Sequence, residues 1–193
     1  MTKKILFIIL LQLNSYVYAQ FNISIRWQAV NAGRVSDTIP YQADRKLTWS
    51  DFKGSPDGAS PAAAITESGF GYRLSMQSFN KKTDVVITVF CYFNKMKSWY
   101  KKGMDTDYGL LHEQHHFDIT YINTCQFIKN LQAAQFNAGN YNYLLQKIHD
   151  ESYAALSKMQ DEYDGQTLNG RITGMQSSWN KKIDRLLKTV LTN

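Results

Sequence analysis

The residues best suited to chemistry form one short block, His112-Glu113-Gln114-His115-His116. The block has the pattern HExxH, in which two histidines are four residues apart. On an α-helix such residues lie on one face, so the imidazoles of His112 and His116 can bind the same metal ion. Glu113 lies beside them and can accept a proton from a water activated there. The block therefore predicts a Zn²⁺ site with Glu113 as its general base.

Other polar residues near the block are placed less favourably. At about 100° per residue, His115 points away from His116, and Cys125 lies nearly opposite to it. Asp118 is a candidate to hold the free N–H of a ligand imidazole, although it lies too far round the helix for His116 to be its obvious partner. The block itself thus supplies two metal ligands.

The block lies in a segment that is typical of a long helix. Residues 108–135 contain no proline and no glycine after Gly109, and apolar residues recur at helical spacing. Much of the circumference of this helix is apolar, so we expect it to be central in the fold. Residues 141–163 predict a second long helix whose apolar residues, Tyr153 among them, face inward, and a third helix follows near the C-terminus.

Strands are predicted in the first half of the chain. Residues 21–30 alternate in polarity, and residues 83–93 are β-branched and aromatic. Residues 62–77 predict a strand in which Gly69 and Gly71 mark a bulge or twist, and this strand forms a hairpin with residues 83–93. Strands followed by helices indicate an α+β fold: N-terminal antiparallel strands, a central HExxH helix and two further helices.

Residues 1–19 have the three-part layout of a secretory signal peptide: a short basic start, an apolar run, and small or compact residues up to Ala19. The apolar run is too short to cross a bilayer of about 30 Å as a helix. We therefore expect cleavage near Ala19, a single domain over residues 20–193, and a secreted or periplasmic location. No later stretch approaches the roughly 18 apolar residues of a membrane helix, so no stable membrane insertion is expected.

The composition excludes several classes of protein. Of the 193 residues, 44% are hydrophobic and 13% aromatic, which excludes a disordered chain. The 22 basic residues outnumber the 16 acidic ones but are spread in short pairs, so we expect no nucleic-acid partner. Two cysteines are too few for a disulfide scaffold; Cys91 and Cys125 either form one disulfide or remain buried thiols.

Several segments together resemble one bacterial family. They are LTWSDFKG at residues 47–54, Lys97-Ser98-Trp99, HEQHHFDIT at residues 112–120, Tyr163-Asp164 with Thr167, and Gln176 with Trp179. The chain is similar here, over roughly residues 45–185, to the predicted secreted zinc-dependent proteases, once a numbered domain of unknown function. The resemblance implies a zincin-like α+β fold, a strand at residues 83–93 near the active-site helix, and a peptide or protein substrate. It also implies that His112 and His116 bind the metal and that Glu113 is the general base.

The chain departs from the family downstream of the block. Where the family often has Tyr-Asp-x-Glu-Thr-x-His-Gly, residues 163–170 have Gln166 in place of the glutamate and Asn169 in place of the histidine. A catalytic zinc site normally has three protein ligands, and zinc accepts aspartate oxygen, so Asp164 is our prediction for the third ligand. The alternatives are Asp150, Glu151, Asp161, Glu162 and His149.

Weaker predictions concern the surroundings of the site. Tyr163, Arg171 or His149 is a candidate to stabilise an oxyanion. We expect the large aromatic side chains to lie in the core rather than on a substrate surface. These are Trp49, Trp99 and Trp179.

Three functions are compatible with this sequence. The favoured one is an exported zinc metallopeptidase. The second is a catalytically impaired zincin-like protein of the cell envelope that binds a metal or a partner, because loss of a third ligand would impair an open site. The third is an exported hydrolase that uses the same site on another amide or on an ester.

Overall fold

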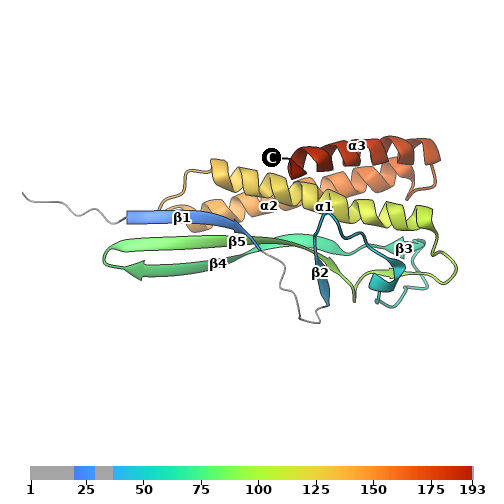
Figure 1. The fold of residues 1–193 in the computed structure, drawn as a ribbon, viewed down its shortest axis with the longest axis horizontal. Helices are drawn as coiled ribbons and strands as arrows, with labels where there is room; N and C mark the ends of the chain where they lie inside the picture. Colours follow the sequence, from blue (N-terminus) through green and yellow to red (C-terminus); the bar gives the residue numbers. More distant parts are fainter. Residues whose placement is uncertain (1–19, 29–36, 193) are drawn as a thin grey trace, which may run out of the picture.

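The computed structural model describes residues 20–28 and 37–192. The chain order is β1 (Gln20–Trp27), β2 (Thr38–Pro40), a 3-10 turn (Trp49–Asp51), β3 (Ala64–Ile65), β4 (Ser68–Phe79), β5 (Lys82–Asn94), β6 (Trp99–Tyr100), α1 (Asp107–Ala133), α2 (Tyr141–Thr167) and α3 (Thr173–Leu191). The predicted signal peptide, and residues 29 and 30 of the predicted first strand, lie outside the described residues. The predicted α+β class is confirmed, with strands first and helices after them (Figure 1).

The main sheet is built around β5. β4 pairs with it antiparallel over its whole length, from Ser68 opposite Phe93 to Phe79 opposite Lys82. On the other side of β5, β1 and then β2 form the neighbouring strands. β2 is antiparallel to β5, whereas β1 is parallel to it, which differs from the expected all-antiparallel arrangement. A parallel neighbour needs a long connection, and the chain between β1 and β5 is long enough to provide it.

The core lies between this sheet and the helices (Figure 1). Alternate residues of β5 are buried because they face α1, as the β-branched pattern of the strand predicts. They are Val85, Ile87, Val89, Cys91 and Phe93. α1 contacts the sheet and also both α2 and α3, so it is the central element that the sequence predicts.

The two glycines of β4 do not mark a bulge. The register from β4 to β5 is unbroken, so the bulge, one of the two predicted alternatives, is absent. A Cβ on Gly71 would lie 2.9 Å from Cζ of Phe90, and one on Gly69 would lie 3.0 Å from the hydroxyl of Tyr92. Glycine is needed here because aromatic rings of β5 lie against the backbone of β4.

The ends of the long helices have identifiable causes. Thr106 caps α1, because its hydroxyl accepts a hydrogen bond from the backbone N–H of Gly109. α2 ends where Leu168, Asn169 and Gly170 adopt positive φ angles of 48°, 52° and 82°. None of the described helices combines the length and the apolar character that a membrane crossing needs.

The two cysteines are free thiols in the structure. Cys91 on β5 is buried, and Cys125 on α1 is half-buried. Burial raises the pKa of both thiols. A raised pKa keeps a thiol protonated and poorly reactive, so these two side chains behave as packing residues.

Candidate metal centre

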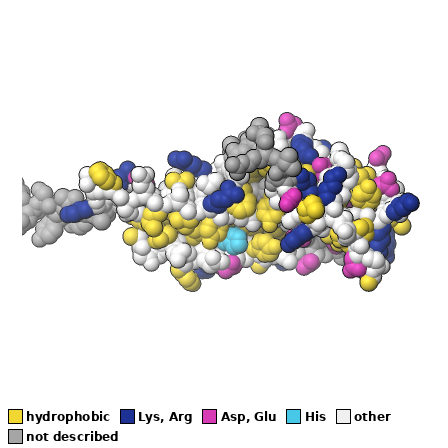
Figure 2. Space-filling model, turned by 90° about the horizontal axis from the view of Figure 1, so that it is seen from below, with side chains coloured by type: hydrophobic (Ala, Val, Ile, Leu, Met, Phe, Trp, Pro, Cys, Tyr) yellow, Lys and Arg dark blue, Asp and Glu magenta, His cyan; other side chains and the backbone are white. Residues whose placement is uncertain are grey.

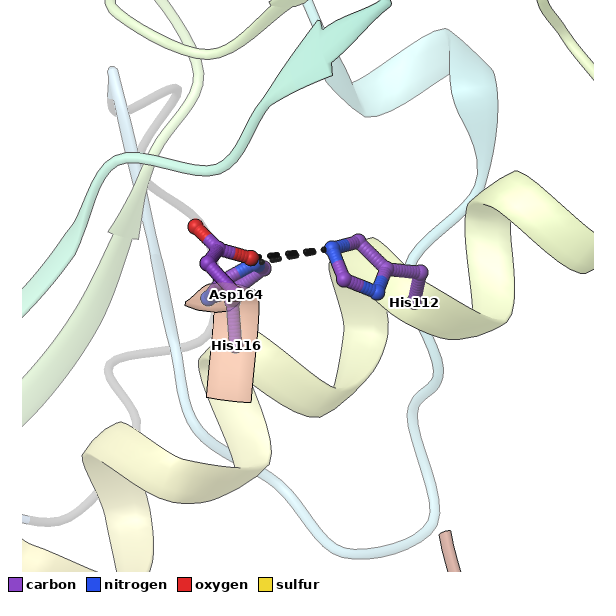
Figure 3. A group of neighbouring side chains, drawn as sticks. All are labelled: His112, His116 and Asp164. Atoms are coloured by element: carbon purple, nitrogen blue, oxygen red, sulfur yellow. Dashed lines mark hydrogen bonds and ion pairs between the residues drawn. The ribbon is translucent and has the colours of Figure 1, made fainter. Parts of the chain in front are cut away.

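Three side chains from two helices converge on one point. Nε2 of His112 and Nε2 of His116, both on α1, lie 3.2 Å apart. Oδ1 of Asp164 on α2 lies 3.2 Å from the first nitrogen and 3.0 Å from the second (Figure 3). These are the three residues that sequence reasoning named as ligands, and among the described residues they form the group that could hold a metal ion.

One of the three converging atoms, Oδ1 of Asp164, lacks an ordinary partner. No hydrogen bond of good geometry reaches Oδ1 of Asp164 among the described residues, although two imidazole nitrogens lie this close to it. Buried polar atoms are normally paired, and one left unpaired is costly. A cation bound by all three atoms satisfies them together, so the donor set fits a metal ion.

Gln160 fixes the orientation of the His116 ring. Its Nε2 donates hydrogen bonds to the backbone oxygen of His116, at 2.9 Å, and to the hydroxyl of Thr120, at 3.2 Å. Its Oε1 therefore faces Nδ1 of His116, 2.6 Å away, and can only accept. Nδ1 must carry a proton, which leaves the lone pair of Nε2 directed at the common point.

Gln176 on α3 does the same for His112. Its Oε1 lies 2.9 Å from Nδ1 of His112, while its Nε2 donates to Tyr163 and Asn180. All three helices therefore contribute to the site. Sequence reasoning included Gln176 only through the family resemblance and missed Gln160. The available signal was spacing, because Gln160 lies one helical turn before Asp164 and shares its face.

Replacing Gln160 by leucine is expected to weaken metal binding by about 10- to 100-fold, the usual effect of losing a partner that orients a histidine ligand. The measurement is affinity for Zn²⁺ by competition with a chromophoric chelator. Gln126→Leu makes the same change at an exposed position on α1, away from the ligand histidines along the helix, and should leave the affinity unchanged. Equal affinities in the two variants would show that Gln160 does not position the ring.

Tyr163 and Gly170 pack behind the ligands. The ring of Tyr163 is fully buried and stacks on His112 with centroids 4.7 Å apart. It does not line the cavity described below, so it is poorly placed to stabilise an oxyanion. Gly170 has positive φ, and a Cβ there would lie 3.4 Å from Nδ1 of His112. Both residues restrict the positions that the His112 ring can take.

The pKa values of His116 and Asp164 are shifted in opposite directions within the site. Burial alone would lower the pKa of His116, but its contact with the Asp164 carboxylate and the charge of Glu113 outweigh burial and raise the pKa to about 9. Partial burial acts to raise the pKa of Asp164, but the rings of His112 and His116 hold it well below its usual range. A proton on His116 thus occupies part of the place where a cation would bind.

The metal-free protein is expected to lose stability as the pH rises from about 6.5 to about 9. The pKa of His116 is raised from 6.5 to about 9 in the folded chain, so its protonation stabilises the fold fully below pH 6.5. This contribution, at most roughly 3 kcal/mol, is lost as the pH rises through about 9. Urea unfolding in the presence of a chelator, from pH 6 to pH 10, measures it. His116→Gln should remove the slope, and an unchanged slope in that variant would assign the effect to another group.

A cavity of about 520 Å³ opens beside the three ligands. Its lining includes both ligand histidines and Glu113 from α1, residues 62–68 on one side and the α2 face with Leu156 and Gln160 on another. Oε2 of Glu113 is buried without a hydrogen-bond partner among the described residues. Glu113 therefore has a free carboxylate oxygen within the cavity wall.

Several predicted residues take other places. Trp99 and Trp179 are buried as predicted, and Trp49 is partly buried against the core but also lines the cavity. His115 points away from the centre toward α3, with Nε2 3.8 Å from Asp184. Its pKa is lowered, mainly by burial.

Asp118 does not contact a ligand histidine. Its Oδ1 accepts hydrogen bonds from Tyr41 at 2.9 Å and Gln114 at 2.8 Å. Gln114 in turn accepts from the backbone N–H of Leu47. This buried network ties the segment before the 3-10 turn to α1, so the role considered for Asp118 at the metal is not its role in the structure.

Gln166 and Asn169, where the sequence differs from the pattern of the family it resembles, lie in different surroundings. Gln166 accepts a hydrogen bond from the indole N–H of Trp179 at 3.0 Å and so joins α2 to α3. Asn169 and Arg171 line the cavity but do not belong to the converging group. None of the alternative ligands belongs to that group either. These are Asp150, Glu151, Asp161, Glu162 and His149.

Fold and site together define an α+β domain whose HExxH helix carries a candidate three-ligand metal centre. No family model, no curated protein and no solved structure matches the chain. We therefore infer the function from the atoms of the site.

Proposed function

We propose that this chain is an exported zinc metallopeptidase of the zincin type. The observation that carries the proposal is the convergence of two histidine nitrogens and one aspartate oxygen at the edge of an open cavity, with Glu113 beside them. The predicted signal peptide and the family resemblance of residues 45–185 support the same function.

The donor set and its spacing favour zinc. Two imidazoles and one carboxylate are the ligands of many catalytic zinc sites, which keep a fourth position open. Tetrahedral coordination with Zn–N and Zn–O bonds of about 2.0–2.1 Å places neighbouring ligand atoms about 3.3–3.4 Å apart. The three pairs of atoms here are separated by 3.2, 3.2 and 3.0 Å, close to that value.

Glu113 is placed to move the protons of peptide hydrolysis. When bound, zinc supplies a Lewis acid that activates water and polarises a carbonyl group. Glu113 accepts a proton from the attacking water as the C–O bond forms, and it then gives this proton to the leaving amine as the C–N bond breaks. The carboxylate can serve in this way because its Oε2 has no other hydrogen bond to break.

The departures at Gln166 and Asn169 do not remove a member of the converging group. Asp164 supplies a third donor atom without either of them. This supports the enzyme over the catalytically impaired binding protein, whose case depends on loss of a ligand.

The test measures the zinc content of purified residues 20–193 and their hydrolysis of peptides. We expect one zinc per chain, lost in His116→Ala, and hydrolysis of a peptide library that requires the metal. A panel of peptides, esters and non-peptide amides distinguishes a peptidase from another hydrolase. One zinc per chain with no turnover of any member of the panel would favour the binding protein.

A further inference from the structure

The β4–β5 hairpin projects beyond the ends of the three helices (Figure 1). Phe79 of β4 is paired with Lys82 of β5. The turn between them consists of Asn80 and Lys81, which have positive φ angles of 45° and 61°. Positive φ at both central residues is typical of the tight hairpin turns that match the twist of paired strands. The hairpin therefore ends in a short and well-defined tip.

Apolar side chains are exposed at this end of the molecule. Phe79 is 74% exposed, and Met76, three residues before it and about 10 Å away at roughly 3.3 Å per residue, is 55% exposed. Tyr143 in the first turn of α2 is 73% exposed at the same end, where its neighbour Tyr141 contacts Phe21 of β1. Figure 2 shows hydrophobic side chains gathered along the narrow half of the molecule, with basic side chains beside them.

The exposed ring of Phe79 is not needed to hold the tip together. The hydroxyls of Ser78 and Thr83 lie 3.0 Å apart, and the amide of Asn22 donates to Asp84 at 2.7 Å, so polar contacts join the strands here. A single exposed apolar side chain needs no explanation, but several together mark a surface that contacts a partner or a membrane. The tip is such a surface.

A separate group of exposed apolar residues belongs to the cavity. Tyr153 is 50% exposed, contrary to its predicted inward position, and lines the cavity together with Met104 and Tyr108. β4 begins in the cavity lining, at Ser68, and ends at Phe79, a span of about 36 Å. The tip is thus distant from the candidate metal centre, and its exposed side chains are not explained by that centre.

The tip carries positive charge and adjoins the predicted signal peptide. Lys82 pairs with Asp84 at 3.1 Å, whereas Lys81 is exposed and forms no ion pair within the part of the chain that the structure describes. Gln20 donates its backbone N–H to the backbone oxygen of Lys81 at 2.9 Å. The predicted signal peptide therefore joins the fold directly beside the tip, so export through a membrane brings the tip to that membrane.

We propose that the tip of the β4–β5 hairpin docks on the surface of an anionic phospholipid membrane. Phe79 enters the boundary between headgroups and acyl chains, with Met76 behind it, while Lys81 meets the lipid phosphates. This is contact with one face of the membrane and not a crossing of it. A stable protein interface draws on roughly 20–30 residues from each partner, far more than a two-stranded tip presents. A few side chains are enough for weak and reversible contact with a bilayer.

Docking through the tip does not depend on the proposed function. The tip shares no residue with the metal centre or with the cavity lining. A docked chain would hold the candidate metal centre, at the other end of β4, up to about 36 Å from the membrane surface.

The experiment measures flotation of residues 20–193 with lipid vesicles. The predicted signal peptide is omitted because its apolar run would bind lipid by itself. One set of vesicles holds phosphatidylglycerol and phosphatidylethanolamine in equal amounts, and the other holds phosphatidylcholine alone. Phe79→Ser and Met76→Ser each remove an exposed apolar side chain from the tip. Met96→Ser is the matched control for the second change, because Met96 is 54% exposed in the turn at the opposite end of β5.

The unchanged chain is expected to float with the anionic vesicles and to bind phosphatidylcholine less tightly. Phe79→Ser should raise the lipid concentration for half-maximal binding about tenfold, because burial of the phenylalanine ring is lost, and Met76→Ser should act in the same direction. Lys81→Gln should weaken binding to the anionic vesicles about fivefold and leave binding to phosphatidylcholine unchanged. Met96→Ser should bind like the unchanged chain.

Three results would overturn the proposal. One is no flotation with the anionic vesicles, and another is equal binding by Phe79→Ser and Met96→Ser. The third is a dimer in sedimentation without lipid that Phe79→Ser converts to a monomer, because a second copy would then occupy the tip. Should circular dichroism show that Phe79→Ser is unfolded, the comparison of Met76→Ser with Met96→Ser decides in its place.

Failure of the docking surface can be told apart from failure of the proposed function. Phe79→Ser should keep the zinc content and the rate of peptide hydrolysis of the unchanged chain, because its side chain lies far from the metal centre. A chain that cleaves peptides but does not float keeps the function and loses the docking surface. A chain that floats through Phe79 but cleaves no peptide keeps the docking surface and loses the enzyme.

Discussion

Glu113→Gln is expected to retain the zinc content of the unchanged chain and to hydrolyse peptides about 100- to 10,000-fold more slowly, the range that general acid–base catalysis contributes. The amide has the shape of the carboxylate but cannot accept the proton of the attacking water. Zinc should remain bound because Glu113 is not a member of the converging group. Single-turnover rates, together with metal analysis of the same samples, measure both effects.

Glu67→Gln is the matched control for this change. Glu67 also lines the cavity, and Glu67→Gln likewise replaces a carboxylate by an amide, but outside the converging group. We expect little change in the rate. If Glu67→Gln slowed hydrolysis as much as Glu113→Gln, Glu67 would be a candidate general base in place of Glu113. If Glu113→Gln lost its zinc, Glu113 would be part of the metal site instead.

The α1 half of the site could be predicted from local periodicity. Histidines four residues apart share a helical face whatever the rest of the chain does, so His112 and His116 were determined by their spacing. The apolar residues around the same helix predicted its central position, which the structure confirms. The class of the fold followed in the same way from the order of strand and helix patterns.

The remainder of the site depends on how helices pack, which no local pattern encodes. Asp164 could be named as a ligand only with five alternatives beside it, because the sequence does not say which face of α2 meets α1. Gln160 and Gln176 approach the histidines from α2 and α3, at sequence separations of 44 and 64 residues. The parallel pairing of β1 is of the same kind, since it brings together strands more than fifty residues apart.

The departure at Gln166 shows why a family pattern has to be interpreted by position. In the sequence, Gln166 places an amide where the resembling family usually has a glutamate. In the structure, this side chain points at the indole of Trp179 and stabilises the contact between α2 and α3. Gln166 therefore contributes to packing beside the site and does not belong to the group of atoms that could hold a metal ion.

Asp164→Ala is expected to lower zinc affinity by more than the roughly 100-fold that loss of an orienting partner can cost, because it removes one of the three donor atoms that would bind the metal in the proposed centre. Asp161→Ala is the matched control, since it removes an exposed carboxylate from the same helix outside the converging group. Competition with a chelator measures both affinities.

A second measurement on the same variant does not require metal. The Asp164 carboxylate helps to raise the pKa of His116, so Asp164→Ala should lower that pKa and flatten the decline in metal-free stability between pH 6.5 and 9. Asp161→Ala should keep the decline. If Asp164→Ala bound zinc like the unchanged chain, another side chain would complete the centre. If it lost zinc but kept the decline, Asp164 would bind the metal without being the group that charges His116.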